Sequence, residues 1–228
     1  TAGDRAHTAT ALRWVYDEPC AGVTSIGPGA LQAMAASIVS SSNGIGVYHI
    51  YGDETTHGEG YNMQQVPKRE QGMFGQITAF MGSSYTLHTP QAFREALRRG
   101  ATRVFHPSKA GPFFLNLPIN TQPARVTLRL GSLPERPQPF VPYLLSDALI
   151  KDAAALISKT SQVAIKAGGG SRKAAEALLY FAETSGAVVV LSPGSTGVLP
   201  NDHPQNMHVG GSKGTISLSL IHISEPTR

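Results

Sequence analysis

Short strand-like runs alternate with helical segments along most of this chain, and this alternation constrains the fold more than any other feature. The predicted strands are 20–25, 45–51, 85–88, 113–117, 163–167 and 187–191. The predicted helices are 5–16, 30–40, 68–81, 90–105, 146–158 and 173–184. Strands that alternate with helices pair in parallel and are covered by those helices, so the sequence predicts an α/β fold with a doubly wound parallel sheet.

A proline-rich segment, LGSLPERPQPFVPY at 130–143, interrupts the alternation. Its prolines are too closely spaced for a helix or a central strand, because each one removes a backbone donor and fixes φ. They are Pro134, Pro137, Pro139 and Pro142. We therefore predict a first α/β domain over 1–122, a linker over 123–145 and a second α/β domain over 146–217.

Composition and charge exclude several classes of protein. Cys20 is the one cysteine among 228 residues, so no internal disulfide can form and a reducing cytoplasm is the predicted compartment. No apolar run is long enough to span a bilayer and no signal peptide opens the sequence, so no membrane partner is predicted. The net charge of +4 is mild. A basic cluster over 94–109 has no interleaved aromatics, so we interpret it as a solvated helix face and predict no nucleic-acid partner.

A rigid corner joins the first strand to the next helix in VTSIGPGALQAM, residues 23–34. Proline fixes φ at Pro28, and a flanking glycine lets the backbone approach a neighbour closely. That neighbour is a phosphate, a flat ring or simply a packed helix. The corner does not match the dinucleotide fingerprint, because Gln32 takes the third glycine position, and it lacks the Lys-Ser/Thr of a phosphate loop.

Two other segments contain residues that could bind a ligand, and each follows a predicted strand. AGGGSRKAAEAL at 167–178 follows a strand and precedes a helix, which suits either a nucleotide loop or close helix–strand packing with Ser171 as a cap. GDETTHGEGYNMQQ at 52–65 offers oxygen and imidazole ligands for a divalent metal, although a polar loop at the carboxyl end of a strand is favoured. The ligand types are Asp53, Glu54, His57 and Glu59. His7 and His49 lie on apolar patterns and are predicted to be hydrogen-bonded structural histidines.

In this order, the segments resemble those of the thiamine-diphosphate-dependent enzymes of the acetolactate synthase and pyruvate oxidase type, near the trihydroxycyclohexanedione hydrolases. HTATALRW is similar to the helix after the family's catalytic glutamate, and VTSIGPGALQAM to its S-x-GPG-A-x-N loop. NMQQ resembles the family's Phe-Gln segment, and AGPFFLNLPINTQ the strand that closes the pyrimidine-binding domain. The text from VAIKAGGGSRK to NDHP resembles the start of the central domain.

The resemblance implies a pyrimidine-binding domain over 1–122, truncated at its start, and a partial Rossmann-like central domain over 146–217. It places the glycine-proline corner under the aminopyrimidine ring of thiamine diphosphate. The residues that would line that ring are Ser25, Pro28, Gly29, Gln32 (the family's Asn position) and Gln64. The implied reaction forms or cleaves a carbon–carbon bond of a small 2-oxo acid or diketone, in a homodimer or tetramer. The central domain binds FAD in some relatives.

Several departures from the family pattern bear on activity. The position of the catalytic glutamate falls at Ala2, and Asp4 is out of phase with it. The diphosphate-binding domain and its magnesium motif are missing, so the chain is expected to be an inactive internal fragment of an active parent. Residues 218–228 resemble translated adapter sequence and are predicted to be non-native. The alternative is a non-catalytic nucleotide-binding or regulatory subunit of the same fold, with AGGGSRK as its site.

Overall fold

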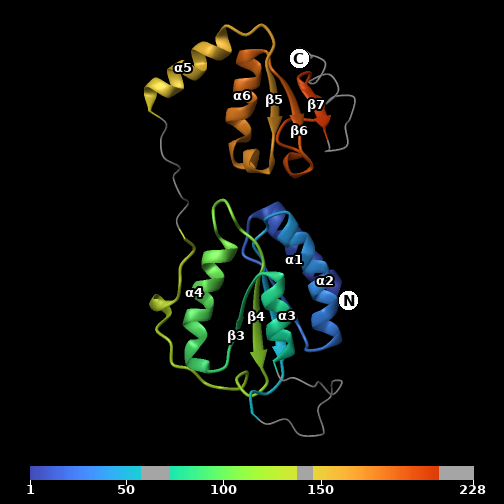
Figure 1. Cartoon of the computed structure of the whole chain (residues 1–228), viewed down its shortest axis with the longest axis vertical. Helices are drawn as coiled ribbons and strands as arrows, with labels where there is room; N and C mark the ends of the chain where they lie inside the picture. The colour runs from blue at the N-terminus through green and yellow to red at the C-terminus, as the bar shows by residue number, and fades with distance from the viewer. Residues whose placement is uncertain (58–71, 138–145, 211–228) are drawn as a thin grey trace. The chain divides into compact units, whose positions relative to one another are not determined.

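Two parallel sheets organise the computed structural model, which describes residues 1–57, 72–137 and 146–210 (Figure 1). The first sheet belongs to a unit formed by 1–140 (unit 1) and the second to a unit formed by 141–228 (unit 2). Both units alternate helices with parallel strands, which confirms the predicted α/β fold class. The predicted domain limits stay predictions.

Unit 1 has four strands in the order β1-β2-β4-β3, all parallel. The strands are β1 (Ala21–Thr24), β2 (Tyr48–Asp53), β3 (Ser83–Thr86) and β4 (Phe113–Pro118). The helices are α1 (Ala2–Tyr16), α2 (Pro28–Ser42), α3 (Met73–Met81) and α4 (Phe93–Val104), with short 3₁₀ turns η1 (Pro90–Ala92) and η2 (Leu130–Ser132).

Side chains along each strand alternate between the two faces of the unit 1 sheet, and both faces are buried. One face carries Tyr51 and Phe114, and packs against alanines of α1 and α2 and against Phe74 of α3. The opposite face carries Ile50 and Phe113 and packs against α4 (Figure 1). Successive strand residues point to opposite faces, so His49 lies on the face of Tyr51.

Unit 2 is a smaller layer of the same kind. Its strands β5 (Ala164–Ala167), β6 (Val188–Leu191) and β7 (Asn206–Val209) pair in parallel in that order. Its helices are α5 (Asp147–Ser158) and α6 (Ala175–Ser185), with 3₁₀ turns η3 (Gly169–Ala174) and η4 (Pro193–Ser195). The buried centre joins Ala182 of α6 to Val189 and Leu191 of β6.

The sequence predicted most of these elements, and two of the differences have local causes. The strand expected at 85–88 lies at Ser83–Thr86, because the chain turns where the His88 N–H donates to the Thr86 carbonyl oxygen at 3.0 Å. The helix expected from 173 begins at Ala175, since a 3₁₀ turn occupies 169–174. The strand β7 was not predicted. Residues 68–71 of one expected helix lie outside the described residues. None of the described helices is long and apolar enough to cross a membrane.

Candidate functional site

The carboxyl ends of the four parallel strands of unit 1 meet at one edge of the sheet. Ligands of open α/β sheets bind at this edge, in the loops that follow the strands. Two features occur there: the glycine-proline corner after β1, and a cavity formed by the loops after β2, β3 and β4.

The corner after β1 is built around Gly27, which is the residue before α2. Its φ of 69° and ψ of −124° belong to a backbone conformation that side chains disfavour. Pro28 then takes the first position of α2, where its missing N–H costs nothing, and the Leu31 N–H donates to the Gly27 carbonyl oxygen at 3.0 Å. The geometry of the turn and of the helix start therefore explains why glycine and proline occur at 27 and 28 without a ligand.

Gly29 has a different reason to be glycine. A Cβ added there would lie 2.7 Å from the Ser25 Oγ, and Gly29 is half-buried in the first turn of α2. The predicted ring-lining residues Ser25, Pro28 and Gln32 are all exposed around it. The structure thus brings four of the five predicted residues onto one small surface. Gln64 lies outside the described residues.

The expected position of the catalytic glutamate, Ala2, lies in the first turn of α1. This turn is close to the start of α2, because a Cβ on Gly3 would lie 3.6 Å from the Gln32 carbonyl oxygen. Asp4 caps α1: its carboxylate accepts hydrogen bonds from the Thr1 amine at 2.6 Å and from the Thr1 hydroxyl at 2.7 Å. The Asp4 carboxylate is therefore directed to the cap of α1, where the Asp4 N–H also donates to the Thr1 Oγ1 at 3.2 Å.

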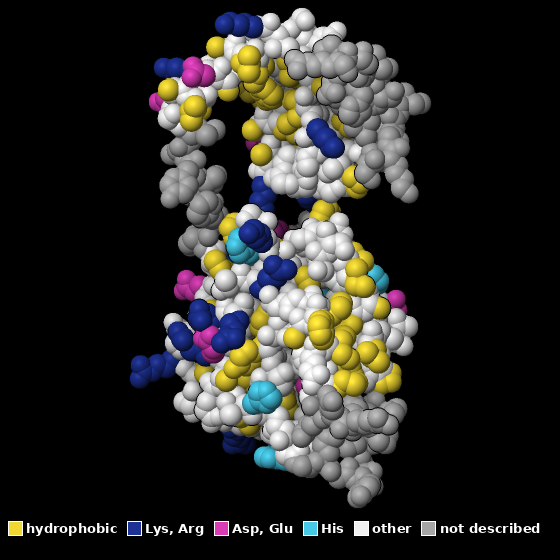
Figure 2. Space-filling view, in the orientation of Figure 1, with side chains coloured by type: hydrophobic (Ala, Val, Ile, Leu, Met, Phe, Trp, Pro, Cys, Tyr) yellow, Lys and Arg dark blue, Asp and Glu magenta, His cyan; other side chains and the backbone are white. Residues whose placement is uncertain are grey.

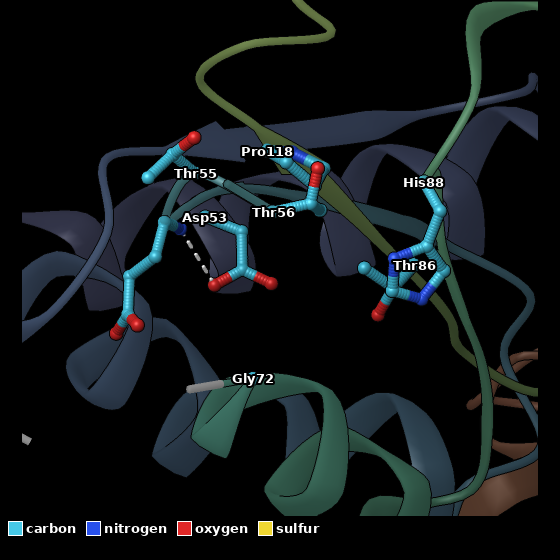
Figure 3. A pocket seen from close by; sticks show the side chains of 8 residues that line it. Asp53, Thr55, Thr56, Gly72, Thr86, His88 and Pro118 are labelled. Carbon is cyan, nitrogen blue, oxygen red and sulfur yellow. Dashed lines mark hydrogen bonds between the residues drawn. The ribbon is translucent and has the colours of Figure 1, made fainter. Parts of the chain in front are cut away.

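A cavity of about 260 Å³ opens at the ends of β2, β3 and β4 (Figure 3). Asp53 and His88 extend toward this space from opposite sides, with Thr86 beside His88. The Glu54 N–H donates to Asp53 Oδ1 at 2.9 Å, and Thr56 is tied to Asn120 through two hydrogen bonds at 2.9 and 2.8 Å. The residues that line the cavity therefore include hydroxyl, imidazole and carboxylate side chains.

The four possible metal ligands of the segment 52–65, for which a polar loop is the favoured interpretation, lie only partly within the described residues. Asp53 and Glu54 are buried, whereas His57 is exposed, and Glu59 lies outside the described residues. Within 1–57, 72–137 and 146–210, no group of three or more His, Cys, Asp or Glu side chains could hold a metal ion.

A polar row crosses the sheet just below this edge. Strand register aligns Thr24 with Tyr51, Tyr51 with Asn116, and Asn116 with Thr86. The Asn116 Nδ2 donates to the Thr78 Oγ1 of α3 at 2.9 Å. Among the described residues, the Thr24 and Tyr51 hydroxyls and the Asn116 Oδ1 are buried without a hydrogen-bond partner. The row was not predicted, because its members come together only through the order of the strands.

His49 lies one row further from the edge and is fully buried. Its ring stacks on Phe114 with centroids 5.2 Å apart, and neither ring nitrogen has a hydrogen-bond partner in the described part of the chain. Burial lowers the pKa of His49 to about 4. The prediction of hydrogen-bonded structural histidines is therefore wrong for His49, and His7 is exposed on α1.

The glycine-rich segment of unit 2 forms the turn η3 after β5. A Cβ on Gly169 would lie 3.4 Å from the Gly194 carbonyl oxygen, so this glycine lets η3 approach η4. Ser171 is not a helix cap: its Oγ donates to the Gly168 carbonyl oxygen at 2.6 Å. Ser195 in η4 fixes the pair by donating to the Ala167 carbonyl oxygen at 2.7 Å. Close packing explains Gly169 without a nucleotide.

The corner in unit 1 offers exposed polar side chains to the ring of a cofactor such as thiamine diphosphate, but the described residues do not fit its charged end. Ser25 and Gln32 are exposed and offer a hydroxyl and an amide, whereas the space in which a Gly29 Cβ would lie is taken by the Ser25 Oγ. A diphosphate of this kind is held through a divalent metal and oxygen ligands. Such a ligand cluster is missing from the part of the chain that the structure describes.

Comparison with known families bears on unit 2. Residues 150–221 match the family model of the thiamine pyrophosphate enzyme central domain. No curated protein matches the chain. The parallel α/β structure of unit 2 is consistent with such a domain. The match covers residues 150–221 only, and for that part of the chain it supports a thiamine-diphosphate-dependent enzyme family.

Proposed function

We propose that this chain is part of a thiamine-diphosphate-dependent enzyme of the acetolactate synthase type, acting on a small 2-oxo acid or diketone. The observation that carries the proposal is the family match over 150–221, which implies dependence on thiamine diphosphate. The glycine-proline corner in unit 1 is consistent with it, because the resemblance places this corner under the aminopyrimidine ring and Ser25 and Gln32 are exposed there. The reaction is the formation or cleavage of a carbon–carbon bond next to a carbonyl group.

In this proposal the corner of unit 1 forms one wall of the cofactor site. Gly29 gives the ring access to backbone, while the Ser25 hydroxyl and the Gln32 amide can hydrogen-bond its polar edge. Pro28 holds the wall rigid, and Gln64 is assigned to the same side by resemblance. When bound, thiamine diphosphate supplies a carbanionic carbon for attack on the carbonyl and a ring that accepts the electron pair.

The remaining parts of the site are proposed to come from outside these 228 residues. They are the carboxylate that contacts the ring nitrogen and the magnesium–diphosphate site. In the resembling enzymes the cofactor lies between two subunits, so the parent is proposed to be a homodimer or tetramer. The exposed apolar side chains Leu31 and Ile38 of α2 suit such an interface.

Chelation tests the proposal on the full-length parent protein. Activity on a panel of 2-oxo acids and diketones should disappear after dialysis against EDTA, and should return only when magnesium and thiamine diphosphate are both added. Light scattering of the reloaded sample should give a dimer or tetramer. Activity that survives complete removal of metal and cofactor would contradict the proposal, and so would an inactive monomer that binds a nucleotide instead.

A further inference from the structure

A second groove lies at the opposite edge of the unit 1 sheet, where β3 and β4 begin. It has a volume of about 460 Å³ and is bounded by the start of β3 and the last turns of α4. Three arginines of α4 line it, Arg98, Arg99 and Arg103, together with Ser83 and Ser84 at the start of β3. Figure 2 shows Lys and Arg side chains gathered along the flank of unit 1 that α4 forms.

All the side chains that line this groove except Phe113 carry hydrogen-bond donors, and none is acidic. Besides the arginines they are Ser83, Ser84, Thr102, His106 and Phe113. The His106 Nδ1 accepts hydrogen bonds from the backbone N–H groups of Ser108 and Lys109 at 3.2 and 2.9 Å. Because Nδ1 is an acceptor, the hydrogen of the imidazole is on Nε2, which is a donor.

The nearby Glu95 compensates only part of this positive charge. Its carboxylate accepts hydrogen bonds from Arg98 at 2.8 Å and from Arg99 at 3.0 Å, and these two contacts lower the pKa of Glu95 to about 2. One carboxylate thus pairs with two of the three guanidinium groups. The Arg99 guanidinium is also held 5.2 Å above the centre of the Tyr85 ring, which limits its freedom before any ligand binds.

Arg103 is the arginine that the fold fixes most closely. Its Nη1 donates to the Lys109 carbonyl oxygen at 2.8 Å, while its Nε is buried without a partner among the described residues. Gly111 leaves the space for this guanidinium, because a Cβ there would lie 2.8 Å from the Arg103 Cζ. A side chain at 111 would therefore displace Arg103 from the groove.

We propose that this groove binds a phosphoryl group carried by a small molecule. Guanidinium groups match the planar, multiply charged oxygens of a phosphate, and the hydroxyls of Ser83 and Ser84 add neutral donors. The groove lies at the amino ends of the strands, a strand length from the corner proposed to contact the cofactor ring. It is therefore a second site that the proposed function does not require.

Calorimetric titration of the full chain with sodium pyrophosphate tests this site. EDTA removes divalent metals, and sodium chloride keeps the ionic strength constant. One saturable site should appear, with an affinity of roughly 0.1–1 mM. Arg99→Gln should weaken it about tenfold, because each charged hydrogen-bond pair is worth roughly that factor. Glu95→Gln should tighten it, since Glu95 competes for two of the arginines.

The matched control is Arg94→Gln, which removes the same charge from the same helix outside the groove. Arg94→Gln and Gly29→Val should both leave pyrophosphate binding within about twofold, because neither residue lines the groove. The absence of saturable binding would overturn the proposal. Equal losses in Arg94→Gln and Arg99→Gln would also overturn it, by showing attraction to general charge. Weaker pyrophosphate binding in Gly29→Val would show that pyrophosphate binds at the glycine-proline corner, and this would overturn the proposal. Tighter binding of a single-stranded oligonucleotide than of pyrophosphate would indicate a macromolecular ligand and would overturn it as well.

Discussion

Gly29→Val in the full-length parent is expected to weaken thiamine diphosphate binding by more than about a hundredfold, or roughly 3 kcal/mol. The added methyl groups would occupy the surface on which the proposed ring lies. The change should destabilise the fold less than it weakens cofactor binding, because Gly29 is half-buried and has no positive φ. The contact to relieve is the 2.7 Å approach to the Ser25 Oγ, and the exposed Ser25 hydroxyl can rotate away. We expect a stability cost of about 1–2 kcal/mol.

Gly27→Val is the matched control, two residues earlier in the same corner. Gly27 is buried with φ 69° and ψ −124°, so a valine there strains the backbone by roughly 1–3 kcal/mol before any crowding. This variant should lose thermal stability first. Melting temperatures of the cofactor-free proteins and cofactor affinities by calorimetry separate the two effects. If Gly29→Val lowered the melting temperature as much as Gly27→Val and the folded fraction kept its affinity, Gly29 would serve only the turn.

Stability on the acid side should depend strongly on His49. Burial lowers its pKa from 6.5 to about 4, so the unfolded chain takes up a proton between these values and the folded chain does not. The free energy of unfolding should therefore fall as the pH is lowered from 6.5 to 4, with His49 contributing up to about 3 kcal/mol. Urea denaturation at a series of pH values measures this dependence.

His49→Leu should remove that contribution and leave stability at pH 7 nearly unchanged. The reason is that both ring nitrogens are already buried without hydrogen-bond partners in the described part of the chain. His7→Leu provides the control, since His7 is exposed on α1 and its variant should keep the wild-type pH dependence. If the free energy of unfolding fell by the same amount between pH 6.5 and pH 4 in His49→Leu and in the unmodified chain, His49 would not be held neutral in the folded state.

The strands and helices could be predicted because most carry a clear periodic pattern with a turn or cap beside it. The strand β7 could not, since Asn-Met-His-Val lacks a run of β-branched residues and His208 has a φ of 59°. A short pattern of this kind does not distinguish a strand from a loop. Its pairing with β6 supplies the backbone partners that the local sequence does not specify.

One part of the candidate site could be predicted from the local sequence, and the other part depends on residues that are distant in sequence. Ser25, Pro28, Gly29 and Gln32 lie within eight consecutive residues, so one motif predicted them together. The cavity at Asp53, Thr86 and Pro118 could not be predicted, because its residues come from β2, β3 and β4, which are separated in sequence. They meet only because β4 lies between β2 and β3. The buried state of His49 likewise depends on its packing against Phe114 of β4.

Calorimetric titration with thiamine diphosphate and magnesium, performed on both the 228-residue chain and the full-length parent, tests the central claim most directly. The parent should bind with a saturable micromolar isotherm. The chain should show no micromolar binding, only the weaker heat that magnesium pyrophosphate alone produces, because the described residues lack a cluster that could hold the metal. Micromolar binding by the chain would contradict the division of the site proposed here, and no binding by the parent would contradict the assignment to thiamine diphosphate chemistry.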